Sequence, residues 1–244
     1  MGTHPHIGLQ TVTWLFEGAL LHKDSLGYEQ VIAPGQLNLM TAGHGICHSE
    51  ESPPGFSGPM HGLQFWIALP AEYEDTPPAF AHHTDLPQWQ QDGAEITLVV
   101  GELAGHRSPA TVFSPLVGAD IVATQACRLT LPVPADFELG LCINEGHAEL
   151  EGETLKTGEL YYLGQGRDTL ILTLSAGSRI MLLGGEPLGQ PVLLWWNFVG
   201  RDQERLNQAV SDWQQWPNDR FGEVSAYQGA PLTAPTLDPS VRLK

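Results

Sequence analysis

Four side chains with metal-ligating chemistry lie in two short motifs near the start of the chain. The first motif holds His4 and His6, one residue apart, and the second holds His48 and Glu50 at the same spacing. Side chains alternate between the two faces of a β-strand, so the members of each pair point the same way. If both segments line one barrel, three imidazoles and one carboxylate converge inside it.

This set of ligands favours a transition metal. Imidazole nitrogens with one carboxylate suit Fe(II), Mn, Ni, Cu or Zn, whereas Ca and Mg prefer mainly oxygen ligands. Four protein ligands leave an octahedral ion two open positions for water, substrate or O₂, as in non-haem oxygenases. Either motif alone is more often a pair of surface residues. Together they predict one mononuclear site held by His4, His6, His48 and Glu50.

The segments that would position these residues read as short β-strands. The chain has 27 Gly and 19 Pro, and the stretches between them are rich in Val, Ile, Leu, Thr and aromatic residues. Regularly spaced short strands predict an all-β sandwich or barrel rather than alternating strands and helices. Examples of the predicted strands are Thr11–Phe16, Gln64–Leu69, Glu95–Val100, Leu139–Ile143, Glu159–Leu163, Thr169–Leu174 and Arg179–Leu183.

One helix is predicted near the C-terminal end, over residues 202–216. Leu206, Val210 and Trp213 share one helical face, and Pro217 would end the helix.

An internal repeat divides the chain. Each copy has an apolar strand, a Glu-Gly turn, a second strand, a turn that ends in Gly35 or Gly158, and a third strand. Such a repeat indicates two copies of one β unit, joined by a proline-rich connector over 70–93. We therefore predict a metal-binding barrel with the connector at 1–85, a second barrel with the helix at 86–216, and a tail at 217–244. The second copy has His147 beside its turn but no paired motif, so we expect that barrel to bind no metal.

The charge balance and the cysteines exclude several classes of function. With 11 Lys+Arg against 28 Asp+Glu the net charge is −17, which disfavours direct nucleic-acid or membrane binding. Cys47, Cys127 and Cys142 are odd in number and form no CxxC, which favours a reducing compartment. With no signal peptide and no apolar stretch of ~20 residues, a cytoplasmic protein is expected. P-loop, GxGxxG and GxSxG motifs are absent from the sequence.

The motifs around the candidate ligands closely resemble the pirin family of the cupin superfamily. The resemblance rests on HPHIGL from residue 4, MTAGHGICHSE from residue 40, HGLQFW from residue 61 and LGGEPLG from residue 183. It covers nearly the whole chain. It implies an all-β bicupin, two stacked jelly-roll barrels with a C-terminal helix. It also implies iron, Fe(II), in the first barrel, held by His4, His6, His48 and Glu50.

The sequence departs from the family pattern in three places. Pirins carry further strands before the first motif, whereas here three residues precede His4, so we expect an internal start or a fragment with an incomplete first barrel. His44 stands where the family usually has Arg, which removes a fixed positive charge. Leu39 stands where an aromatic residue is common, which alters the pocket.

Two functions from different classes follow from the resemblance. The first is a quercetin 2,3-dioxygenase, which cleaves a flavonol with O₂ and releases carbon monoxide, with Glu50 as ligand and general base in turn. The alternative is a redox-sensitive regulator, in which the oxidation state of the iron alters a surface that binds a transcription factor or a metabolic enzyme. Inward ligands with open positions favour the dioxygenase, and the acidic surface suits a protein partner rather than DNA. A third alternative is a shortened chain that does neither.

Overall fold

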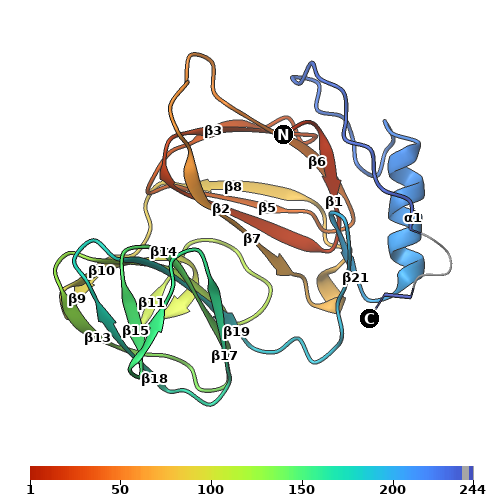
Figure 1. The fold of residues 1–244 in the computed structure, drawn as a ribbon. Coiled ribbons are helices and arrows are strands. Elements are labelled where there is room, and N and C mark those ends of the chain that lie inside the picture. Colours follow the sequence, from red (N-terminus) through yellow and green to blue (C-terminus); the bar gives the residue numbers. More distant parts are fainter. Residues whose placement is uncertain (238–241, 244) are drawn as a thin grey trace. The chain divides into compact units, whose positions relative to one another are not determined.

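The computed structural model describes residues 1–237 and 242–243 of the chain. Strands dominate it, and the described part contains a single α-helix, which confirms the predicted all-β class (Figure 1). Contacts group the chain into two compact units. One comprises residues 1–84 and 188–244, and the other comprises residues 85–187. The first unit contains two four-stranded sheets and the two-stranded sheet β20-β21, and the second unit contains two sheets.

The first unit is a barrel of two four-stranded sheets, in the orders β1-β6-β3-β4 and β7-β2-β5-β8. Its strands are β1 (His4–His6), β2 (Leu9–Glu17), β3 (Leu20–Asp24), β4 (Glu29–Ile32), β5 (Leu37–Thr41), β6 (Ile46–Glu51), β7 (His61–Ala68) and β8 (Ala79–His83). Side chains from the two sheets meet inside the barrel. Gln64 of β7 bonds to Glu50 of β6, and Phe80 of β8 stacks on His22 of β3. The interior of this barrel therefore holds polar and aromatic side chains beside aliphatic ones.

A sharp turn joins β1 to β2 and brings the first motif to the barrel wall. Gly8 has φ of +69° there, a conformation that residues with a Cβ rarely adopt. A Cβ at this position would also collide with the carbonyl oxygen of Val199. The turn is held by hydrogen bonds from Gly8 N to Gly43 O and from Leu69 N to Gly8 O, each 2.9 Å long.

The C-terminal helix belongs to the first unit, although the sequence analysis placed it with the second barrel. α1 (Gln203–Gln214) starts at the N-cap Asp202, whose side chain accepts a hydrogen bond from Arg205 N. After residue 188 the chain returns to the first unit through β20 (Leu193–Trp195) and β21 (Phe198–Gly200), and Phe198 bridges to Ile7 beside β1. The apolar face of α1 packs in one cluster with Ile7 and Phe198 (Figure 1). This packing, rather than nearness in sequence, decides where the helix belongs.

Part of the predicted tail, 217–244, also packs on this cluster. Phe221, Val224 and Ala234 are buried in it. Residues 238–241 and 244 of the tail lie outside the described residues.

The second unit is a barrel whose interior is aliphatic. A seven-stranded sheet has the order β11-β10-β12-β19-β14-β17 with β9 added on β10, and a four-stranded sheet has the order β13-β18-β15-β16. Its strands are β9 (Gln88–Gln91), β10 (Ala94–Leu103), β11 (His106–Arg107), β12 (Leu116–Ala123), β13 (Cys127–Pro132), β14 (Glu138–Glu145), β15 (Ala148–Leu150), β16 (Glu153–Leu155), β17 (Leu160–Gly164), β18 (Thr169–Leu174) and β19 (Arg179–Gly185). Leu, Ile, Val and Ala side chains from both sheets form one buried core.

The segment predicted as a connector, 70–93, is structured over much of its length. It contains a short 3₁₀ helix, Ala71–Tyr73, the edge strand β8, which pairs with β5, and the edge strand β9, which pairs with β10. The prolines mark the turns between these pieces correctly. The two edge strands escaped sequence reasoning because neither AFAHH nor QWQQ shows the apolar alternation of a half-buried strand.

None of the helices in the described part of the chain is both long enough and apolar enough to span a membrane.

Candidate metal centre

The two histidine-bearing strands lie side by side in the first barrel. β1 pairs antiparallel with β6, and His4 lies directly opposite His48 in this register. His6 follows on the same face of β1, two residues along. The ligand nitrogens of His4, His6 and His48 all lie within 4.8 Å of one another, and all three side chains are buried. The structure therefore brings together three of the four residues predicted to ligate a metal.

Each imidazole has a hydrogen-bond partner at its Nδ1 atom. His4 Nδ1 lies 2.8 Å from the carbonyl oxygen of Gly2, and His6 Nδ1 lies 3.2 Å from that of Asn197. A carbonyl oxygen only accepts, so both rings carry their proton on Nδ1 and leave a lone pair on Nε2. His48 Nδ1 contacts the Nδ1 atom of His22 at 3.3 Å.

Burial keeps the three rings neutral. It lowers the pKa of His4 from 6.5 to about 4. Burial is also the largest cause that lowers the pKa of His6 and of His48 well below the ordinary value, and the neighbouring histidines lower both further. A neutral imidazole is the form that binds a metal, so no proton has to be displaced at pH 7.

These donors fit a transition metal. His6 Nε2 lies 3.1 Å from His48 Nε2, and when both rings carry their proton on Nδ1 neither Nε2 atom can donate to the other. Nitrogen lone pairs that face one another at this distance repel, and a cation among them relieves the repulsion. Three neutral imidazoles suit Zn, Cu, Fe and Ni better than Mg or Ca.

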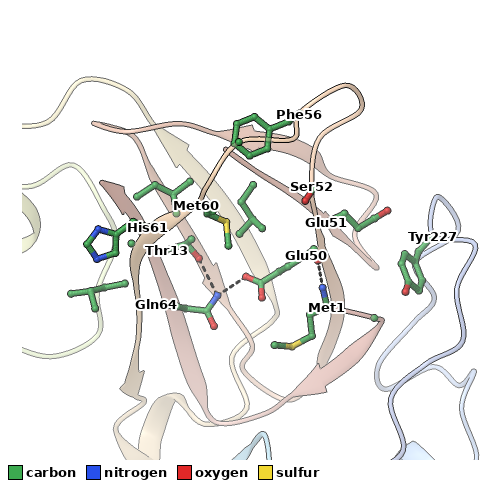
Figure 2. Close-up of a pocket in the computed structure, with 16 residues that line it drawn as sticks. Met1, Thr13, Glu50, Glu51, Ser52, Phe56, Met60, His61, Gln64 and Tyr227 are labelled. Atoms are coloured by element: carbon green, nitrogen blue, oxygen red, sulfur yellow. Dashed lines mark hydrogen bonds between the residues drawn. The ribbon is translucent and has the colours of Figure 1, made fainter. Parts of the chain in front are cut away.

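Glu50 lies near these histidines but outside the group that converges within 4.8 Å. It shares a face of β6 with His48 and is nearly buried, with 9% of its surface exposed. Gln64 Nε2 donates to Glu50 Oε1 at 2.5 Å and to Thr13 Oγ1 at 3.2 Å, which fixes the orientation of the carboxyl (Figure 2). Burial raises the pKa of Glu50, and the hydrogen bond from Gln64 opposes that rise. The role of Glu50 as a fourth ligand stays a prediction.

A cavity of about 720 Å³ opens beside Glu50. Figure 2 shows Glu50 and Gln64 joined by a hydrogen bond at its wall, with Phe56, Met60 and His61 among the other lining residues. Cavities of ~300–1,000 Å³ with apolar walls and a few fixed polar groups are typical small-molecule sites.

Two further side chains neighbour the histidines. Trp66 is 37% exposed, and its ring lies 5.3 Å from that of His6. His22, which sequence reasoning missed, contacts His48 and also bonds to Asp24. The HxD spacing of His22 and Asp24 could have marked them as a pair. Only the pairing of β3 with β6 shows that this pair lies against Glu50 and His48.

The other singled-out residues hold no metal-like cluster. Within the described residues, His4, His6 and His48 form the only group of three or more His, Cys, Asp or Glu side chains that converge closely enough for a metal. His147 in the second barrel pairs with Glu149 at 3.2 Å. Cys47 faces away from the histidines, as its strand parity predicts, and its thiol contacts the carbonyl oxygen of Gly222.

Two barrels, one lined with histidines and one filled with aliphatic side chains, make this chain a bicupin with one candidate metal centre. The pirin family model matches residues 1–67, and the model described as the pirin C-terminal cupin domain matches residues 118–221. The chain belongs to the pirin family, which confirms the resemblance of its motifs.

Individual relatives support the same assignment. A Pseudomonas aeruginosa protein named "Putative quercetin 2,3-dioxygenase PA1205" is 50% identical over 237 residues, which cover 97% of this chain and 75% of that protein. A pirin-like protein of Caulobacter vibrioides is 40% identical over 217 residues, 86% of this chain and 74% of the relative. The crystal structure of a quercetin 2,3-dioxygenase from Acinetobacter baumannii has a TM-score of 0.95 at 44% identity, covering 100% of this chain and 81% of that one.

Proposed function

We propose that the chain is a mononuclear non-haem iron dioxygenase of the quercetin 2,3-dioxygenase type, which cleaves a flavonol-like substrate with O₂. The observation that carries the proposal is the group of three buried, neutral histidines beside a carboxylate that faces a cavity. The names of the relatives at 50% and 44% identity point to the same reaction class.

His4, His6 and His48 would hold the metal, with Glu50 as the fourth ligand. When bound, iron would supply a Lewis-acidic position and the redox chemistry that O₂ requires. The Nε2 atoms of His4 and His6 are free of protons, so these two rings would bind a metal without rearrangement of their hydrogen bonds. Manganese, nickel, copper and zinc suit the same donors.

Glu50 is the group placed to take a proton from the substrate. A flavonol must lose the proton of its 3-hydroxyl before the ring opens, and Glu50 is the carboxylate that both lines the cavity and lies on the histidine-bearing face of β6. Its raised pKa brings its basicity closer to that of a phenolic hydroxyl. Gln64 holds one carboxylate oxygen, so the other oxygen is the one that faces substrate.

The cavity walls suit a planar aromatic molecule. Leu15, Leu20, Phe56, Met60 and Leu63 contribute apolar surface, against which flavonol rings can pack. We also propose a cytoplasmic location, which the three free cysteines favour.

Anaerobic reconstitution with Fe(II), followed by a quercetin assay under air with detection of carbon monoxide, tests the proposal. Iron-loaded protein should consume quercetin and release one carbon monoxide per turnover, while the same protein treated with chelator should do neither. Fully iron-loaded, reduced protein that leaves quercetin untouched would remove this activity and favour the regulator alternative.

A further inference from the structure

His22 and Asp24 form a buried pair behind the histidine group that the proposed reaction does not use. Both lie on β3, which pairs with β6 so that His22 is opposite Glu50 and Asp24 is opposite His48. His22 Nε2 lies 2.9 Å from Asp24 Oδ2, and His22 Nδ1 lies 3.3 Å from His48 Nδ1. A continuous path of hydrogen bonds therefore runs from a buried carboxylate to a candidate metal ligand.

His48 differs from its two partners in what its Nδ1 atom meets. His4 and His6 face backbone carbonyls, which accept only, so the proton of each ring is fixed by the backbone. His48 faces another imidazole, which can either accept or donate at Nδ1. The direction of this one hydrogen bond decides whether His48 Nε2 carries a lone pair or a proton.

Asp24 determines the direction of the hydrogen bond between His22 and His48. Its carboxylate accepts from His22 Nε2, so a neutral His22 has its only proton there and a lone pair on Nδ1. His48 must then donate from Nδ1, and its Nε2 lone pair faces His4 and His6. We propose that Asp24, acting through His22, is a positioning residue that fixes the tautomer of His48 for metal binding. This inference rests on the proposed metal site.

The pair is itself held rigidly. Asp24 Oδ1 accepts from the backbone N–H groups of Leu26 and Tyr28, at 2.9 and 3.1 Å. The ring of His22 stacks on Phe80 with centroids 4.4 Å apart and planes 12° apart. Outer partners of this kind orient metal-bound histidines, and their loss commonly costs ~10–100-fold in metal affinity.

The substitution Asp24→Asn should reverse the direction of both hydrogen bonds, the one between residue 24 and His22 and the one between His22 and His48. The two backbone N–H groups keep the amide oxygen on their side, so the new NH₂ group faces His22 Nε2. His22 must then accept at Nε2 and donate from Nδ1 to His48, which moves the proton of His48 onto Nε2. We expect the affinity for Co(II), measured by competition with a chelator, to fall ~10–100-fold.

Two further variants keep the test independent of folding. His22→Gln presents an amide oxygen to His48 and an NH₂ group to Asp24, so this variant should retain most of the wild-type affinity for Co(II). His22→Phe keeps the stacked ring but offers no acceptor, so it should bind as weakly as Asp24→Asn. Glu149→Gln is the matched control, because His147 and Glu149 form a pair of the same spacing at 3.2 Å in the other barrel. It should leave Co(II) affinity unchanged.

Nitrogen-15 spectra of the metal-free protein report the tautomer directly. The proton of His48 should sit on Nδ1 in the wild type and in His22→Gln, and on Nε2 in Asp24→Asn. A folded Asp24→Asn protein with the wild-type tautomer and affinity would overturn the proposal. If wild-type protein bound no Co(II) at all, the metal site itself would be wrong, and that result is distinct from the loss of the tautomer control.

Discussion

At the scale of single residues, strand pairing brings His48 beside His4 and brings His22 behind His48. Side chains alternate along a strand, so His4 and His6 share a face whichever strand β1 pairs with. The contacts of His22 depend instead on which residue of β6 lies opposite, and that register is set by the whole barrel. For this reason the shared face of His4 and His6 could be predicted, whereas the contacts behind His48 could not.

The substitution Glu50→Gln tests the role of the carboxylate as base. The amide keeps the size and one oxygen but loses the charge and the basicity, so flavonol turnover should fall by about 10²–10⁴-fold while metal is partly retained. Steady-state turnover and metal content of the same samples provide the measurement. Glu51→Gln is the matched control, because Glu51 also lines the cavity but pairs with Lys23 at 3.1 Å. Unchanged turnover in Glu50→Gln would show that Glu50 is not the base, although the protein would still be an enzyme.

Cys47 should be inert although it adjoins His48. Its thiol is fully buried, and burial raises its pKa to about 11. At pH 8 only about one thiol in a thousand is then ionised, and the thiolate is the reactive form. Iodoacetamide should therefore modify Cys127 and Cys142, which are partly exposed, before Cys47 in native protein. Labelling of all three after denaturation is the control, and rapid labelling of native Cys47 would contradict the burial.

At the scale of elements, local pattern predicted many of the strands and the helix but not where the helix packs. All seven predicted strands are present, because each combines alternating apolar residues with turn residues at its ends. The helix was placed with the second barrel because it follows that barrel in sequence. Its apolar face in fact packs beside β21 and Ile7, and no local periodicity reports that the chain returns to the first barrel.

The turn between β1 and β2 should be the most sensitive connection near the metal centre. Gly8→Ala combines a positive φ with a collision at Val199 O, so it should lower the free energy of unfolding by about 2–5 kcal/mol and weaken metal binding. Gly35→Ala is the matched control. Its φ is +81°, but a Cβ would meet open space, so the loss should be only about 1–2 kcal/mol. Urea unfolding measures the free energy of unfolding of both variants. Equal losses in Gly8→Ala and Gly35→Ala would show that the structure shifts to relieve the collision at Val199.

At the scale of the whole molecule, two copies of one fold have diverged in their interiors. The first barrel keeps its interior polar around three histidines and opens to a cavity. The second fills the same kind of space with aliphatic side chains, which stabilise a core but offer no ligand. This division was predictable, because the paired motifs occur in one sequence repeat and not in the other.

The most direct test of this account is the number of transition-metal ions bound per chain. Elemental analysis of reconstituted protein should give one ion per chain in the wild type and in His147→Ala, because His147 belongs to the aliphatic barrel. His48→Ala removes one of three converging nitrogens and should abolish stable binding. Two ions per chain, or one ion retained in full by His48→Ala, would contradict the assignment of the metal centre.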